Sequence, residues 1–99
     1  MISHTVMFRL RTDLSDAERL QAAVTFKRDI EALPALIPTI RSIRVGLNIN
    51  PAEQWHICLV SEFDTLSDVA TYAAHPAHVS AAARLKPAVA ERACADCEF

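Results

Sequence analysis

The sequence predicts an α+β fold, and three observations lead to this prediction. Apolar and polar residues alternate, as in half-buried strands, over residues 2–10, 39–49 and 55–63. Apolar residues with helical spacing follow the first and the third of these strands. With 99 residues, the chain has room for one domain, residues 1–99, but not for the repeated βα units of a doubly wound sheet. Together with a short last strand, this order is that of a ferredoxin-like βαββαβ sandwich with an antiparallel sheet.

The first strand and helix have the clearest signals. Apolar side chains and one histidine share one face of the strand: Ile2, His4, Val6, Phe8 and Leu10. Ser15 and Glu18 form a capping box, which predicts that a helix starts at about residue 16. Its apolar stripe consists of Leu20, Ala23, Phe26, Ile30 and Leu33. The helix should stop before Pro34, which lacks the N–H donor that a helix interior needs.

The third strand, residues 55–63, is apolar on both faces. Trp55, Ile57, Leu59 and Phe63 lie on one face, and Cys58 and Val60 on the other. A strand of this kind is covered on both sides, and a chain of this length has too few helices to cover both. We therefore expect a homodimer in which Trp55, Ile57 and Leu59 face the partner.

The second half of the chain predicts a broken helix and a last strand. Thr65 and Asp68 indicate a capped helix that ends near His75, because the residue before a proline avoids the helical conformation. Pro76 suits the first turn of a further helix. Residues 93–99 are expected to form the last strand.

Composition excludes several classes of protein. The net charge is −2 and no basic stripe with interleaved aromatic residues occurs, which argues against nucleic-acid binding. No apolar run approaches the roughly 20 residues that cross a bilayer, and the first residues lack the pattern of a signal peptide, so we expect a cytoplasmic protein without membrane contact. Gly46 is the only glycine, which excludes glycine-rich phosphate loops. We expect no cofactor.

The three cysteines do not suggest a disulfide framework. Their number is odd, and Cys94 and Cys97 would point to opposite faces of a strand. We expect free thiols and no metal site. Asp96 and Glu98 are expected to be solvated or to lie at a dimer edge.

Four segments and the chain end resemble the stress-responsive α/β barrel (Dabb) family. They are residues 4–10 (HTVMFRL), 37–48, 56–63 and 72–78 (Y-x-x-H-P-x-H), followed by the closing residues 96–99. The motif at residues 72–78, together with the first strand, is the most specific part. Cys97 departs from the pattern, because the family usually has tyrosine there.

The resemblance implies a ferredoxin-like fold whose sheet joins that of a second subunit to form a barrel. It does not imply one function. In one member type, a polyketide cyclase, a histidine matching His78 is the base of an aldol condensation and a tyrosine matching Tyr72 assists it. Histidines matching His4 and His56 line the same pocket. Arg92 stands where that pocket is apolar.

The residues and the resemblance together predict a pocket between sheet and helices, with His78 and Tyr72 at its rim. The expected ligand-binding residues are His4, Val6, Phe8, Phe26, His56, Cys58, Val60 and His75. Plainer roles stay open for several of them: His4 and His56 as core histidines, and His75 as a helix cap. The first hypothesis is a module that binds a small, partly apolar ligand. The alternative is a cofactor-free enzyme of the cyclase or aldol-type lyase class, with a monooxygenase as the third possibility.

Overall fold

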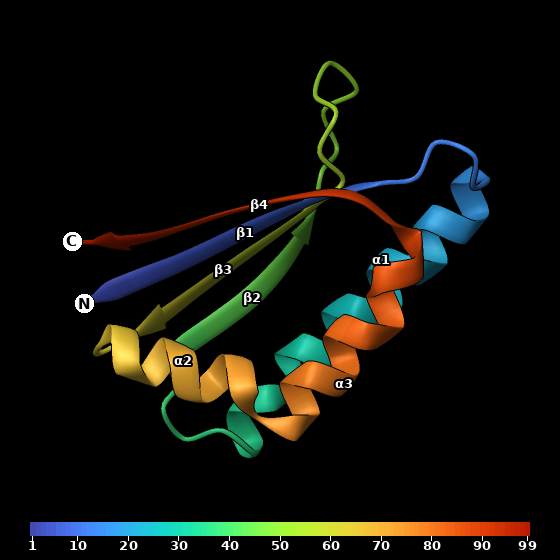
Figure 1. Ribbon diagram of the computed structural model, residues 1–99. Helices are drawn as coiled ribbons and strands as arrows, with labels where there is room; N and C mark the ends of the chain where they lie inside the picture. Colours follow the sequence, from blue (N-terminus) through green and yellow to red (C-terminus); the bar gives the residue numbers. More distant parts are fainter.

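The computed structural model describes residues 1–99, and Figure 1 shows one sheet with all helices on one of its faces. In chain order the elements are β1 (Ile2–Leu10), α1 (Asp16–Glu31), the short 3-10 helix η1 (Leu33–Ala35), β2 (Ser42–Leu47), β3 (Ile57–Phe63), α2 (Leu66–Ala74), α3 (Pro76–Leu85), the 3-10 helix η2 (Lys86–Ala88) and β4 (Val89–Glu98). This order and the antiparallel pairing of the strands confirm the predicted ferredoxin-like fold.

The sheet has the strand order β2-β3-β1-β4, and every neighbouring pair is antiparallel. The two central strands, β1 and β3, contain all the buried residues of the sheet except Val45 of β2. Residues that face each other in register point to the same side of the sheet. Val6 lies opposite Leu59 on β3 and opposite Cys94 on β4, so these three side chains point toward the helices.

Helix α1 begins at the predicted capping box. The Ser15 side chain accepts from the Glu18 N–H at 3.1 Å, and the Glu18 carboxylate accepts from the Ser15 N–H at 2.9 Å. Its buried residues are Ala23, Phe26 and Ile30, which belong to the predicted stripe. Leu20 does not take part, because the first turns of the helix extend beyond the sheet and leave it 57 % exposed.

The break between α2 and α3 also follows the sequence signals. Thr65 caps α2 by accepting from the Asp68 N–H, and His75 caps α3 by accepting from the Ala77 N–H through Nδ1. Pro76 occupies the first position of α3, where a backbone N–H would have no partner within the helix, so its absence costs no hydrogen bond.

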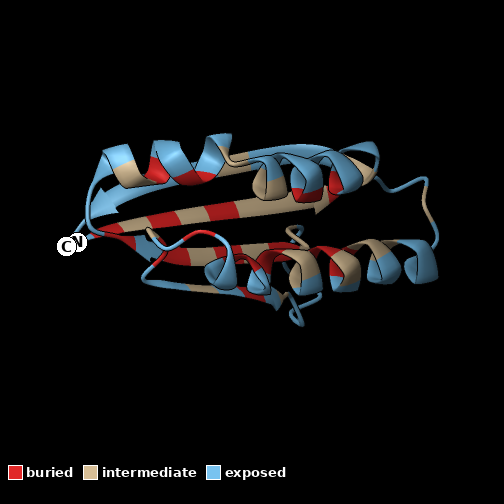
Figure 2. Ribbon diagram, turned by 90° about the horizontal axis from the view of Figure 1, so that it is seen from below, coloured by how far each residue is buried: buried red, intermediate tan, exposed pale blue.

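The core lies between the helices and one face of the sheet (Figure 2). It holds 17 buried hydrophobic residues, among them Leu10, Ile57, Leu59, Phe63 and Tyr72. The prediction that Ile57 and Leu59 face a partner is therefore wrong: they oppose Phe8 and Val6 of β1 and lie beneath the helices. The other face of β3, with Cys58 and Val60, is covered by no element of the chain and is half-buried.

The limits of three strands also differ from prediction. β3 begins at Ile57 rather than at Trp55. β2 is shorter than residues 39–49, since residues 37–40 form a turn in which the Ile40 N–H donates to the Ile37 carbonyl. β4 starts at Val89 rather than at residue 93, because β1 offers an unpaired edge along its whole length. No helix of the chain combines the length and the apolar character that crossing a bilayer requires.

Candidate functional site

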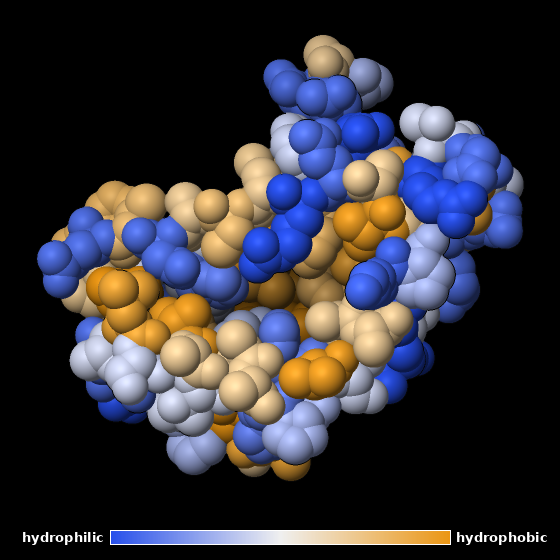
Figure 3. Space-filling model, in the orientation of Figure 1, coloured by the Kyte–Doolittle hydropathy of each residue, from blue (hydrophilic) through white to orange (hydrophobic).

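A cavity of about 520 Å³ lies between the inner face of the sheet and helices α2 and α3. Figure 3 shows the surface hollowed there, with apolar side chains along the hollow. Eleven of its 15 lining residues are hydrophobic, and the others are His4, His78, Lys86 and Arg92. Such a wall, apolar with a few polar groups, is typical of small-molecule sites.

Val6, Phe8 and Phe26 line the apolar part of this cavity. The rings of Phe8 and Phe26 meet edge to face with centroids 5.3 Å apart, joining β1 to α1. Leu59 adds to this wall from β3.

Tyr72, on the inner side of α2, is fully buried, and its hydroxyl has no hydrogen-bond partner. Its ring centroid lies 4.4 Å from that of His78 and 6.0 Å from that of His4. Burial raises the pKa of the phenol well above its ordinary value, while the positive charge of Arg92 opposes this rise. The hydroxyl is therefore a protonated donor that lacks an acceptor.

His78 lies in the first turns of α3 and has a defined tautomer. Its Nδ1 lies 2.9 Å from the Ala73 carbonyl oxygen. Because a carbonyl oxygen can only accept, Nδ1 carries the proton and Nε2 of the neutral ring has a lone pair. Burial lowers the pKa of His78, and the Ala73 hydrogen bond only partly offsets this effect. The ring is thus a neutral proton acceptor near pH 7.

The helix break makes this hydrogen bond possible. In a continuous helix, the Ala73 carbonyl would accept from the Ala77 N–H. Here the Ala77 N–H donates to His75 Nδ1, which leaves the Ala73 carbonyl to His78. The tyrosine and the two histidines of the Y-x-x-H-P-x-H segment therefore differ in role. Tyr72 supplies a buried hydroxyl, His75 caps α3, and His78 bonds to the Ala73 carbonyl.

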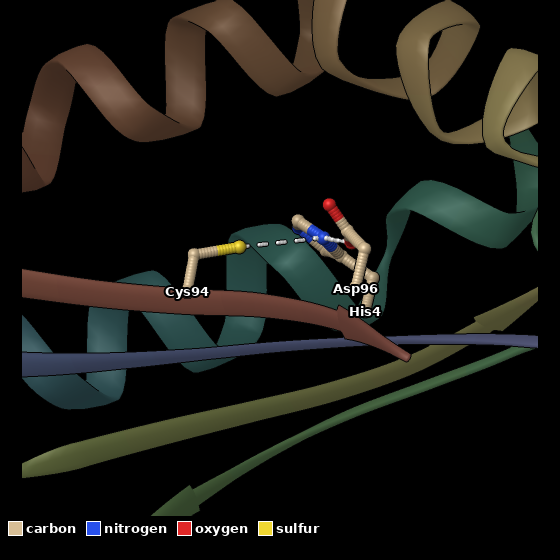
Figure 4. A group of neighbouring side chains, drawn as sticks. All are labelled: His4, Cys94 and Asp96. Atoms are coloured by element: carbon tan, nitrogen blue, oxygen red, sulfur yellow. Dashed lines mark hydrogen bonds and ion pairs between the residues drawn. The ribbon is translucent and has the colours of Figure 1, made fainter. Parts of the chain in front are cut away.

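His4 lines the cavity from β1, next to two side chains of β4 (Figure 4). Its Nδ1 lies 2.5 Å from Asp96 Oδ1 and 3.7 Å from Cys94 Sγ. The register explains the cluster, since His4 opposes Asp96, and Val6 opposes Cys94. Asp96 is exposed on the edge strand, as expected, but its bond to His4 was not predicted.

The ligand atoms of His4, Cys94 and Asp96 all lie within 4.8 Å of one another, as metal ligands do. However, a tetrahedral zinc ion would hold the nitrogen and the carboxylate oxygen about 3.3 Å apart. The observed 2.5 Å is instead a hydrogen bond from Nδ1 to the carboxylate. Cys94 and Asp96 both approach the same ring nitrogen, so they do not form a relay across the imidazole either.

Four of the predicted ligand-binding residues do not line the cavity. His56 precedes β3, and its Nδ1 accepts from the Leu10 N–H at 2.9 Å. Burial and the charges of Arg19 and Arg9 lower its pKa. Cys58 and Val60 point to the opposite face of the sheet, because β3 pairs with β1 through the other set of side chains. His75 uses its Nδ1 to cap α3.

Lys86 and Arg92 line the cavity but were absent from the predicted site. Arg92 lies on β4 directly opposite Phe8, so the register of the last strand would have revealed it. Cys94 and Cys97 lie on opposite faces of β4, as predicted, and all three cysteines are free.

The fold and the cavity define a ferredoxin-like domain with a site between sheet and helices. The sequence model of the stress responsive A/B barrel domain matches residues 2–99, so the chain belongs to this family. No curated protein matches the chain.

Solved structures agree with this assignment. A dimeric protein of unknown function and ferredoxin-like fold from Bacteroides fragilis is 52 % identical, with a TM-score of 0.97 over 99 % of this chain and 95 % of that one. A hydroxynitrile lyase from Passiflora edulis has 17 % identity and a TM-score of 0.74, with 99 % and 92 % covered. An antibiotic biosynthesis monooxygenase has 6 % identity and a TM-score of 0.78, with 100 % and 98 % covered. The last two show a shared fold.

Proposed function

We propose that the chain is a cytoplasmic protein that binds a small, partly apolar molecule with an accepting oxygen in the cavity between sheet and helices. The observation that carries this proposal is the buried Tyr72 hydroxyl, a donor without an acceptor beside an apolar cavity. A buried, unpaired hydroxyl costs about 1–3 kcal/mol. A ligand oxygen that accepts from it would recover part of this free energy.

Binding can be tested with 2-acetonaphthone, an aromatic methyl ketone, by isothermal titration. We expect one ligand per chain, with weaker binding by Tyr72→Phe. Ala82→Trp, which places a large ring in the cavity from α3, should abolish binding. Leu20→Trp, at an exposed position of α1 outside the cavity, is the matched control. Equal binding by wild type and Ala82→Trp would contradict the site.

A second candidate function is proton abstraction next to a carbonyl without a cofactor, as in an aldol-type lyase. It is favoured by the 4.4 Å between the ring centroids of His78 and Tyr72 and by the lone pair on His78 Nε2. In this reaction Nε2 takes a proton from the carbon next to the carbonyl, and the Tyr72 hydroxyl donates to the enolate oxygen.

Exchange of the methyl protons of 2-acetonaphthone in deuterated water, followed by NMR, tests this activity. Abstraction by His78 and return of a solvent deuteron give CD₃ product at a rate above the buffer background. We expect His78→Gln to remove this rate and Tyr72→Phe to lower it about 10- to 1000-fold. If wild type and His78→Gln exchange at the same rate, the chain binds but does not catalyse.

We also propose that the chain forms a homodimer through the uncovered face of the sheet. Its central side chains include Met7, Cys58 and Val60, which are half-buried within one chain. The dimeric state of the Bacteroides fragilis relative supports this arrangement. The interface should bury on the order of 1,200–2,000 Å². Light scattering that gave the mass of one chain at micromolar concentration would contradict it.

A further inference from the structure

We infer that the ligand of this cavity is an organic anion, a carboxylic acid with an apolar body, whose carboxylate is held by Arg92 and Lys86. This inference rests on the proposed binding function and adds the chemical class of the ligand. It follows from the ion pairs of the chain, from the charges on the cavity wall and from the register of β4.

Almost every basic side chain of the protein has an acidic partner. Of its ten lysines and arginines, all but Arg44, Lys86 and Arg92 form ion pairs. Two of these three unpaired cations line the cavity. The third, Arg44, points away from it, on the uncovered face of β2.

The cavity wall contains no aspartate or glutamate that could balance Lys86 and Arg92. Asp96 lies nearby, but its carboxylate is bonded to His4. The chain as a whole carries a net charge of −2, so this local excess of positive charge is not a property of its composition. The positive charge of Arg92 also acts within the site: it adds to the effect of burial in lowering the pKa of His78, and it opposes the rise that burial causes in the pKa of Tyr72. An anion that enters this cavity meets an attractive potential and donors free to bind it.

The pairing of β4 with β1 indicates where the apolar body of the ligand would lie. Arg92 lies directly opposite Phe8, whose ring meets that of Phe26. A carboxylate held by Arg92 therefore starts at the β4 edge of the cavity and leaves its apolar body against the phenylalanine wall. Tyr72 also lines the cavity, and its buried hydroxyl is a further donor without a partner. One negative charge suits this site better than two, because most of the wall is apolar and desolvation of a dianion costs more.

Two probes of nearly equal shape test the inference: 2-naphthoate, which carries a carboxylate, and 2-acetonaphthone, which carries a neutral acetyl group. In titrations of the 99-residue chain we expect naphthoate to bind about tenfold more tightly than 2-acetonaphthone, the difference that one charge-assisted hydrogen bond makes. Arg92→Gln should remove this preference and leave the affinity for 2-acetonaphthone within about twofold. Lys86→Gln should reduce the preference for 2-naphthoate less than Arg92→Gln does, since the lysine ammonium lacks the paired donors of a guanidinium.

Arg44→Gln is the matched control, because it removes an unpaired cation of the opposite face and should change neither affinity. Equal affinity for both probes, or an equal loss of both in Arg92→Gln, would overturn the anion inference and leave the proposed binding function intact. If neither probe binds, the anion inference and the proposed binding function are both wrong. A third probe, 2-naphthyl phosphate, tests the class of anion: binding tighter than that of naphthoate would overturn the assignment to carboxylates.

Discussion

The two faces of the sheet differ in what covers them, although the same strands make both. On the inner face, Val6, Leu59 and Phe63 lie beneath three helices and are almost fully buried. On the outer face, Met7, Cys58 and Val60 keep partial exposure, since no element of the chain lies over them. The inner face also carries His4 and Arg92 of the candidate site, and the helices above it carry Tyr72 and His78.

One face is thus stabilised within the chain, whereas the other would be covered in the proposed dimer. Inner-face changes should alter the free energy of unfolding of each chain, and outer-face changes should alter dimerisation.

Phe63→Ala should give the largest effect. The side chain is fully buried on the inner face, in contact with the rings of His4 and Tyr72. Its truncation should lower the free energy of unfolding by about 3–5 kcal/mol. Denaturant unfolding well above the dimer dissociation constant measures this loss. A loss below about 1 kcal/mol would show that this part of the inner face is not a close-packed core.

Val60→Asp should break the dimer and leave the chain folded. A carboxylate in the centre of an apolar interface must be desolvated without a partner, so we expect dissociation to become at least about 100-fold more favourable. Sedimentation velocity gives the dissociation constant, and circular dichroism shows whether the fold remains. Glu62→Gln, at an exposed position further along the same face, is the control. An unchanged dimer in Val60→Asp would place the interface elsewhere.

Tyr72→Phe should raise the free energy of unfolding by about 1 kcal/mol, because it removes a buried hydroxyl that has no partner. A gain of stability together with weaker ligand binding would be typical of a residue kept for function. Tyr72→Leu serves as the control and should destabilise, since it also removes the ring contacts with His78 and Phe63. If Tyr72→Phe destabilises instead, the hydroxyl has an acceptor within the chain.

The pH dependence of stability should reveal the protonation of His78 on α3. Burial lowers the pKa of His78 below the ordinary value of 6.5, so the unfolded chain takes up a proton at higher pH than the folded chain does. The stability is therefore fully present above about pH 6.5 and falls as the pH drops through the pKa of the folded state. His56, whose pKa is also lowered, contributes in the same direction.

Unfolding free energies measured from about pH 7.5 to 5.5 should show a smaller decline for His78→Gln than for wild type. The double variant His56→Gln/His78→Gln should decline least. A wild-type curve that is flat over this range would contradict the lowered pKa values.

Metal removal should have the smallest effect, none at all. Since His4 Nδ1 and Asp96 are already satisfied by their hydrogen bond to each other, a chelator should leave the unfolding midpoint unchanged. Purified protein should contain no stoichiometric zinc by mass spectrometry. A stoichiometric ion that is lost in Cys94→Ser would show that the cluster opens to bind metal.

The fold could be predicted from the sequence because its signals are local. Ser15 and Glu18 mark one helix start, Thr65 another, and Pro76 the break between α2 and α3. The alternation of apolar and polar residues predicts which face of β1 is buried, because only one of its faces is strongly apolar.

The faces of β3 could not be assigned in this way, because both are apolar. Pairing with β1 decides which side lies beneath the helices, and pairing is a long-range property that alternation does not contain. For the same reason, His56 and Cys58 were predicted in the pocket, and the pairing of His4 with Asp96 was missed. Tyr72 and His78 of the motif at residues 72–78 both line the cavity, because one short segment contains both, but Tyr72 is fully buried rather than at the predicted rim.

The helix break has a consequence for how such a protein can change over evolutionary time. The protonated nitrogen of His78 is fixed by the Ala73 carbonyl, a backbone group that the turn at Pro76 releases. The walls of the cavity, in contrast, are side chains on β1, α3 and β4 that mutation can exchange one by one. Substitutions of the cavity-lining side chains can therefore change which ligand binds, while the His78 tautomer stays the same. Ligand specificity and the proton-accepting nitrogen can thus evolve independently.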